Sequence, residues 1–183
     1  AESGAVAEII QGHTFAGLPI ARSGTDHQRA RYLPKMAAGS AVGAMLLTEP
    51  DAGSAPSGLA ATAETTDTGY RLSGQKAFGT NAGVADVNLV VARVRPQPEQ
   101  NHGVSVLLVR EPEEAEGFEF DRVRYMGMRG HVTGDSTFEN VEVPAENLLG
   151  AVGEGFRIAM GTIDMARTGL GAIGAGIARG AFD

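Results

Sequence analysis

The sequence predicts an α+β chain of more than one domain, in which an antiparallel β-barrel or sandwich is flanked by helical segments. Apolar residues recur with the period of a helix near both ends of the chain. Between residues 44 and 146, short strand-like runs follow one another with turn signals between them. No helix-length run separates these strands, so antiparallel pairing is favoured over a parallel, doubly wound sheet.

Residues 1–43 are predicted to form the end of a helical domain. Thr25 is a suitable N-cap for a helix that begins at the next residue. Pro34 disfavours the helical conformation of the residue before it. We therefore expect this helix to end near Tyr32 or Leu33.

Residues 44–146 are predicted to form a β domain of about a hundred residues, which is within the usual size range of a domain. The run LVVA at 89–92 is apolar on both faces, which predicts a buried strand. Val104, Val106 and Leu108 alternate with their neighbours, and we expect them to share one face of the next strand.

Residues 147–183 are predicted to begin a helical bundle with one long amphipathic helix. Its apolar residues recur at helical spacing, at Phe156, Met160, Ile163, Leu170, Ile173 and Ile177. The glycines after residue 168 each cost such a helix up to about 1 kcal/mol relative to alanine, so it needs close packing against its neighbours. The run GLGAIG at 169–174 matches the GxGxxG pattern of dinucleotide sites, but it is preceded by helix, and a packing role is favoured.

Composition describes a globular chain and argues against several classes. The 183 residues are 43% hydrophobic and 20% charged, and the 26 glycines follow no collagen period. A net charge of -7 argues against binding to nucleic acid or to an acidic membrane. The sequence has no cysteine, no apolar run of membrane-spanning length and no basic leader, so we expect a cytoplasmic location and no membrane span.

One segment suggests a binding site. In LLTEPDAGS, at 46–54, a strand ends in a polar turn that contains glycine. The hydroxyls of Thr48 and Ser54, with backbone N–H groups, would form a concave site for an anionic or heteroaromatic ligand. Ordinary turn chemistry is the alternative. The four histidines lack metal-ligand spacing and no GxSxG motif occurs, so neither a metal site nor a hydrolase is predicted.

Four ordered motifs resemble those of the acyl-CoA dehydrogenase family: LLTEPDAGS at 46–54, GQKAFGTNAG at 74–83, FENVEVPAENLLG at 138–150 and GEGFRIAMGTIDMAR at 153–167. The resemblance covers nearly the whole chain. It implies a flavoprotein subunit of fatty acid metabolism that forms a dimer or homotetramer, with FAD held between the β domain and the helical bundle. Because the sequence starts without Met and ends without a helix-stop signal, we expect it to be a segment of such a subunit.

The resemblance implies α,β-dehydrogenation of an acyl thioester, carried by CoA or by acyl-carrier protein. In that reaction a Glu removes the α proton and the β hydrogen leaves as hydride to flavin N5. Ala166 stands where a minority of the family carries this Glu, so we expect the base outside the segment and assign no catalytic residue within it. Electron-transfer flavoprotein is the implied acceptor. The alternatives are a flavin oxidase or monooxygenase on the same scaffold, and a non-catalytic subunit.

The family's binding residues are matched position by position. The first flavin-binding segment corresponds to Met45, Leu47, Thr48, Gly53 and Ser54, and the second to Phe78, Gly79 and Thr80. The implied substrate contacts are Ser54, Asp164 and Arg167. Phe78 replaces the customary Trp, which keeps an aromatic face but loses the indole donor.

Overall fold

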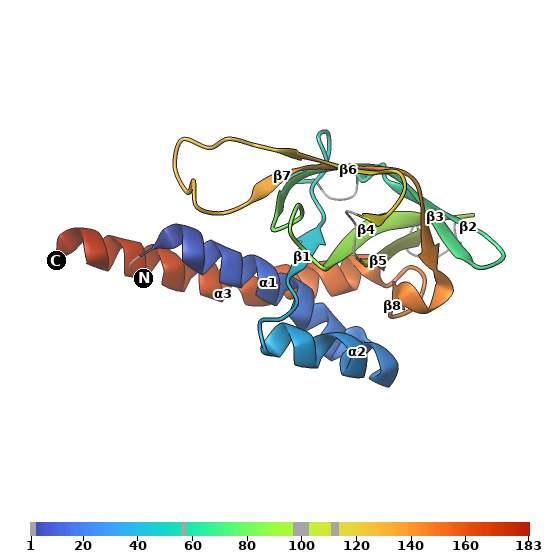
Figure 1. The fold of residues 1–183 in the computed structure, drawn as a ribbon, viewed down its shortest axis with the longest axis horizontal. Coiled ribbons are helices and arrows are strands. Elements are labelled where there is room, and N and C mark those ends of the chain that lie inside the picture. Colours follow the sequence, from blue (N-terminus) through green and yellow to red (C-terminus); the bar gives the residue numbers. More distant parts are fainter. Residues whose placement is uncertain (1–2, 56–57, 97–102, 111–113) are drawn as a thin grey trace.

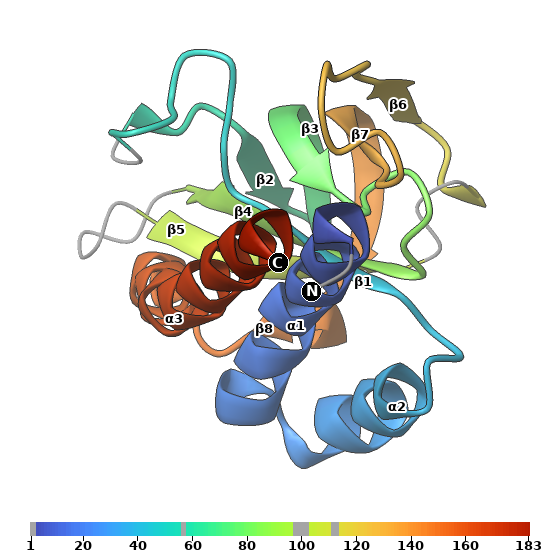
Figure 2. The same cartoon turned by 90° about the vertical axis from the view of Figure 1, so that its left-hand side faces the viewer.

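The computed structural model describes residues 3–55, 58–96, 103–110 and 114–183. Two helices, α1 (Gly4–Ser23) and α2 (Asp26–Ala37), precede the β region, and α3 (Gly155–Phe182) follows it. Figures 1 and 2 show α1 and α3 side by side beneath the sheet, with α2 on the far side of α1. The arrangement confirms the predicted class, a β domain flanked by helical segments.

Thr25 caps α2 as predicted, and it does so in a capping box. The Gln28 N–H donates to the Thr25 hydroxyl at 3.1 Å, and the Thr25 N–H donates to Gln28 Oε1 at 2.9 Å. The Gln28 amide also donates to the carbonyls of Glu146 and Leu148, which ties α2 to the end of the β region.

The predicted end of α2 near Tyr32 or Leu33 is wrong, because the helix continues through Pro34 to Ala37. Pro34 removes one helical N–H donor, but the following turn places Met36 in the core and is thereby stabilised. The helix then ends in a Schellman motif in which Gly39 has a φ of 70°.

The β region forms one mixed sheet in the order β6-β7-β3-β2-β4-β5-β8, with β1 paired to β4. Its strands are β1 (Gly43–Leu46), β2 (Thr62–Thr65), β3 (Gly69–Thr80), β4 (Val87–Arg95), β5 (Val104–Arg110), β6 (Phe118–Arg122), β7 (Thr133–Pro144) and β8 (Leu148–Leu149), with a short 3₁₀ helix, η4 (Ala145–Asn147), before β8. Most pairs are antiparallel, as predicted.

Two pairings are parallel, and together they explain how the site is built. Residues 43–46 of β1 pair with residues 87–90 of β4, and residues 62–64 of β2 pair with residues 93–95 of the same strand. The strands β1 and β2 therefore occupy successive stretches of one edge of β4. The segment between them, residues 47–61, leaves the sheet and returns to it, and we call this segment the excursion.

The strand β4 separates two apolar cores, which confirms that the LVVA run is buried on both faces. Val90 and Ala92 pack inside the β region, whereas Leu89 and Val91 pack against the helices. The predicted face of Val104, Val106 and Leu108 also belongs to the core that the helices cover.

The long helix predicted after residue 146 is confirmed as α3, and the GLGAIG run lies within it. Close packing is found at Gly169, where a Cβ would lie against the Gln11 side chain of α1. Gly171 and Gly174 face open space. Within the described ranges, no helix combines the length and the apolar character needed to cross a membrane.

Candidate cofactor site

A pocket of about 170 Å³ lies where α1, α3, the end of β1 and the end of β3 meet. It is lined by Glu8, Gly12, Phe15, Met45, Leu47, Thr48, Ala77, Phe78, Gly79, Thr80 and Ile163. The structure thus brings together most of the residues assigned to the two flavin-binding segments, namely Met45, Leu47, Thr48, Phe78, Gly79 and Thr80. The first segment, at the end of β1, and the second segment, at the end of β3, are about thirty positions apart in the sequence and together form one wall of the pocket.

The remaining predicted site residues lie outside the lining of this pocket. Gly53 and Ser54 are exposed in the excursion, beyond the bridge between Glu49 and Ala52. Asp164 and Arg167 pair with each other at 3.3 Å on an exposed face of α3. Their roles in binding phosphate or substrate remain predictions.

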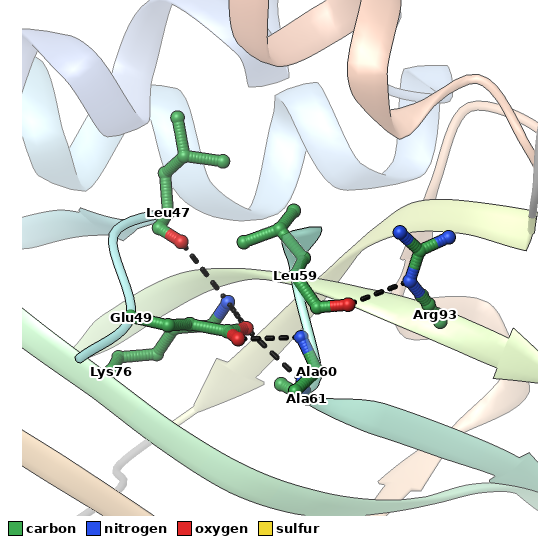
Figure 3. A network of polar contacts seen from close by, with 7 residues as sticks. All are labelled: Leu47, Glu49, Leu59, Ala60, Ala61, Lys76 and Arg93. Atoms are coloured by element: carbon green, nitrogen blue, oxygen red, sulfur yellow. Dashed lines mark hydrogen bonds and ion pairs between the residues drawn. The ribbon is translucent and has the colours of Figure 1, made fainter. Parts of the chain in front are cut away.

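A buried ion pair joins the two segments of the pocket wall (Figure 3). Lys76 Nζ lies 2.6 Å from Glu49 Oε1, and the side chains are 0% and 5% exposed. The ammonium also donates to the Leu47 carbonyl at 3.1 Å. The Glu49 carboxylate accepts the N–H groups of Ala60 and Ala61. Burial lowers the pKa of Lys76, and the adjacent Glu49 opposes this shift.

Sequence reasoning missed this pair. Both residues lie inside the motifs that carry the resemblance, but neither is among the positions that the resemblance assigns to flavin binding. The strand β3 also carries Arg71, which is exposed, so a basic residue in this strand did not by itself signal a buried pair.

A bulge in β3 directs Phe78 toward the pocket. The pairing of β3 with β7 shifts register between Lys76 and Gly79, and Phe78 has a φ of 56°. The Phe78 N–H donates to Asp135 Oδ1 at 3.1 Å, and the residue as a whole is 60% exposed. The second segment therefore offers an aromatic face at the pocket rather than packing it in the core.

Helix α1 is held against the same end of β3. Asn81 is buried with a φ of 67°, and its Nδ2 donates to the Ile9 carbonyl at 3.0 Å. Gly12 permits the close approach, because a Cβ there would lie 2.7 Å from Thr80 Cγ2. Glu8, the one acidic side chain in the lining, belongs to the wall that α1 contributes.

The chemistry of this pocket suits a planar heteroaromatic ligand. The lining combines apolar side chains, including the aromatic rings of Phe15 and Phe78, with the hydroxyls of Thr48 and Thr80, which can donate or accept. Among the described residues, no group of three or more acidic or histidine side chains could hold a metal ion. Fold and pocket together define a ligand-binding β domain whose site is completed by flanking helices.

Comparison with known proteins assigns the family. Residues 44–141 match the model of the acyl-CoA dehydrogenase middle domain, and residues 1–40 match that of the acyl-CoA dehydrogenase N-terminal domain. The chain belongs to the acyl-CoA dehydrogenase family. The resemblance inferred from the four motifs is thereby confirmed.

Individual relatives agree with this assignment. An acyl-CoA dehydrogenase of Bacillus subtilis is 38% identical over 183 residues, which cover 99% of this chain and 48% of that protein. The structure of butyryl-CoA dehydrogenase from Megasphaera elsdenii matches 97% of this chain and 46% of its own, with 36% identity and a TM-score of 0.90. An acyl-CoA dehydrogenase from Bacillus anthracis, solved in complex with FAD, matches 92% of this chain and 28% of its own, with 32% identity and a TM-score of 0.84. The chain therefore spans about half the length, or less, of these relatives.

Proposed function

We propose that the protein carrying this chain is an FAD-dependent dehydrogenase that introduces an α,β double bond into an acyl thioester. The observation that supports this most strongly is that one pocket between the β domain and the helices is lined by Met45, Leu47, Thr48, Phe78, Gly79 and Thr80. These are the residues matched to the two flavin-binding segments.

The residues present fit the flavin ring of FAD. Leu47 and Phe78 would contact its flat faces or edges, and the hydroxyls of Thr48 and Thr80 would hydrogen-bond its heteroatoms. Gly53 and Ser54, in the exposed part of the excursion, would contact the phosphates. FAD, when bound, supplies the capacity to accept a hydride.

The contribution of this chain is to bind and orient rather than to move the proton. Ala166, buried in α3, has no group that could accept the α proton. We propose that a Glu from outside residues 1–183 does so, and that Asp164 and Arg167 contact the thioester carrier. Accurate placement of the substrate matters because its α proton must be removed while the β hydrogen leaves.

The carrier, the acceptor and the assembly are part of this proposal. Acyl-CoA is the carrier we favour over acyl-carrier protein, because a relative named as an acyl-CoA dehydrogenase is 38% identical over 99% of this chain. We propose electron-transfer flavoprotein as the acceptor, since a relative from Acetobacterium woodii is named as a subunit of a caffeyl-CoA reductase-Etf complex. We further propose a cytoplasmic homo-oligomer, either a dimer or a homotetramer, that acts in fatty acid metabolism.

The test is anaerobic mixing of the purified complete flavoprotein with butyryl-CoA and longer saturated acyl-CoA thioesters. We expect the flavin absorbance near 450 nm to bleach with at least one of them. A protein that holds flavin but is reduced by no acyl thioester, on CoA or on acyl-carrier protein, would contradict dehydrogenation and favour a non-catalytic subunit. Reoxidation by air faster than by electron-transfer flavoprotein would identify an oxidase instead.

A further inference from the structure

The ion pair between Glu49 and Lys76 is better explained by its position beside the pocket than by a contribution to the stability of the fold. A buried ion pair is often no more stabilising than apolar residues of the same shape, because both charges lose their hydration. Its location is therefore more informative than its existence. Glu49 lies at the start of the excursion and Lys76 lies in β3 directly before the bulge.

Lys76 fixes the first wall segment onto the second. Its ammonium donates to the Leu47 carbonyl at 3.1 Å and to Glu49 Oε1 at 2.6 Å. The next residue of β3, Ala77, donates its N–H to the Thr48 carbonyl at 2.8 Å. Two consecutive residues of β3 thus hold three consecutive residues of the excursion.

Glu49 fixes the returning limb of the excursion (Figure 3). Its carboxylate accepts the N–H groups of Ala60 and Ala61, immediately before β2 begins. Arg93 of β4 donates from Nε to the Leu59 carbonyl at 2.6 Å on the same limb. The carboxylate therefore closes the base of the loop that carries Ser54.

The bond from Lys76 also orients a backbone group of the wall. In a trans peptide the carbonyl and the following N–H point in opposite directions. Because the Leu47 carbonyl is directed at the ammonium, the Thr48 N–H points away from Lys76. Thr48 itself lines the pocket.

We propose that Glu49 and Lys76 are positioning residues that set the placement of Leu47 and Thr48 relative to Phe78 and Thr80 around the flavin. This inference rests on the proposed function, because it assumes that the pocket holds the flavin ring. The pair acts through the backbone it holds and does not touch the ligand.

The test compares three variants of the complete flavoprotein with the wild type. Lys76→Met removes the ammonium at similar volume, Glu49→Gln removes the charge but keeps an acceptor, and the double variant restores electrical neutrality. FAD dissociation constants, visible circular dichroism of the bound flavin and melting temperatures are measured for each. If Lys76→Met gives no folded protein, the results for Glu49→Gln and the double variant decide whether the pair positions the pocket wall.

We expect at least a tenfold weaker affinity for FAD in each single variant, with an altered visible circular dichroism spectrum. The double variant should regain much of the melting temperature but not the flavin signature, because the Leu47 carbonyl still lacks its donor. Wild-type affinity and an unchanged spectrum in the folded variants would overturn the inference.

Two control variants lie in the same strand, β3. Leu72→Ala opens a cavity in the core inside the β region and should lower the melting temperature while leaving the flavin spectrum unchanged. Arg71→Met removes an exposed ion pair with Glu142 and should change neither. A spectrum altered equally by Leu72→Ala would overturn the positioning role. A wild-type protein that binds no FAD would instead refute the proposed function itself.

Discussion

The backbone N–H of Phe78 donates to Oδ1 of Asp135 at 3.1 Å, across the bulge that turns β3 toward the pocket. Asp135 lies on the neighbouring strand β7, where it is exposed. A surface carboxylate thus fixes the backbone from which an aromatic ring faces the proposed flavin site.

Asp135→Ala should weaken both the bulge and FAD binding. The Phe78 N–H loses its acceptor, and because the site is exposed to water, we expect a loss of about 1 kcal/mol in the free energy of unfolding. Asp135→Asn keeps an acceptor and should lose less. Urea unfolding and FAD titration measure the two effects, with Glu139→Ala on the same strand as the control. Equal results for the alanine and asparagine variants would contradict this role for the side chain.

Replacing Phe78 by glycine and by alanine should separate backbone strain from the ring. Both variants remove the aromatic face, so both should bind FAD more weakly than the wild type. Of the two replacements, only glycine adopts a φ of 56° without strain. We therefore expect the free energy of unfolding of Phe78→Gly to be about 1 kcal/mol higher than that of Phe78→Ala. If the two variants are equally stable, the left-handed backbone at Phe78 carries no strain.

Gly12→Ala should destabilise the protein although alanine is the better helix former. The added Cβ would lie 2.7 Å from Thr80 Cγ2 and 3.1 Å from Asn81 Nδ2, and we expect a net loss of about 1–3 kcal/mol. The matched control is Gly171→Ala in α3, where the Cβ meets open space and should stabilise by up to about 1 kcal/mol. Thermal unfolding measures both. A stabilising Gly12→Ala would show that α1 does not pack closely on β3.

Glu8→Gln should raise the midpoint potential of the bound flavin. A carboxylate in the pocket lining disfavours added negative charge on a reduced ligand. An interaction of about 1 kcal/mol corresponds to about 20 mV for a two-electron couple, which sets the expected size of the shift. Redox titration measures it, with the exposed Glu64→Gln of β2 as the control. A lower potential for Glu8→Gln would be inconsistent with Glu8 facing the ring.

Local sequence patterns predicted the elements well but not the way β1 and β2 meet β4. The spacing of apolar residues and the positions of turn residues identified the strands, because both depend on residues only a few positions apart. The two parallel pairings depend on where the excursion of residues 47–61 returns, which no local pattern encodes. The end of α2 was misjudged for a related reason, since burial of Met36 outweighs the preference of the residue before Pro34.

The pocket wall was anticipated from motifs, whereas its support was not. Thr48 and Thr80 were assigned by resemblance, and the structure places both in one lining. The pair of Glu49 and Lys76 joins residues 27 positions apart, and a sequence does not show which charged residues will meet in a buried site. The bulge at Phe78 requires a positive φ, which the local sequence does not predict.

A crystal structure of the complete protein with FAD bound would show where the flavin ring lies. We expect the ring to lie against Leu47 and Phe78, with the hydroxyls of Thr48 and Thr80 within hydrogen-bonding distance of its heteroatoms. A flavin ring bound elsewhere on the protein, with this pocket filled by side chains or water, would contradict this expectation.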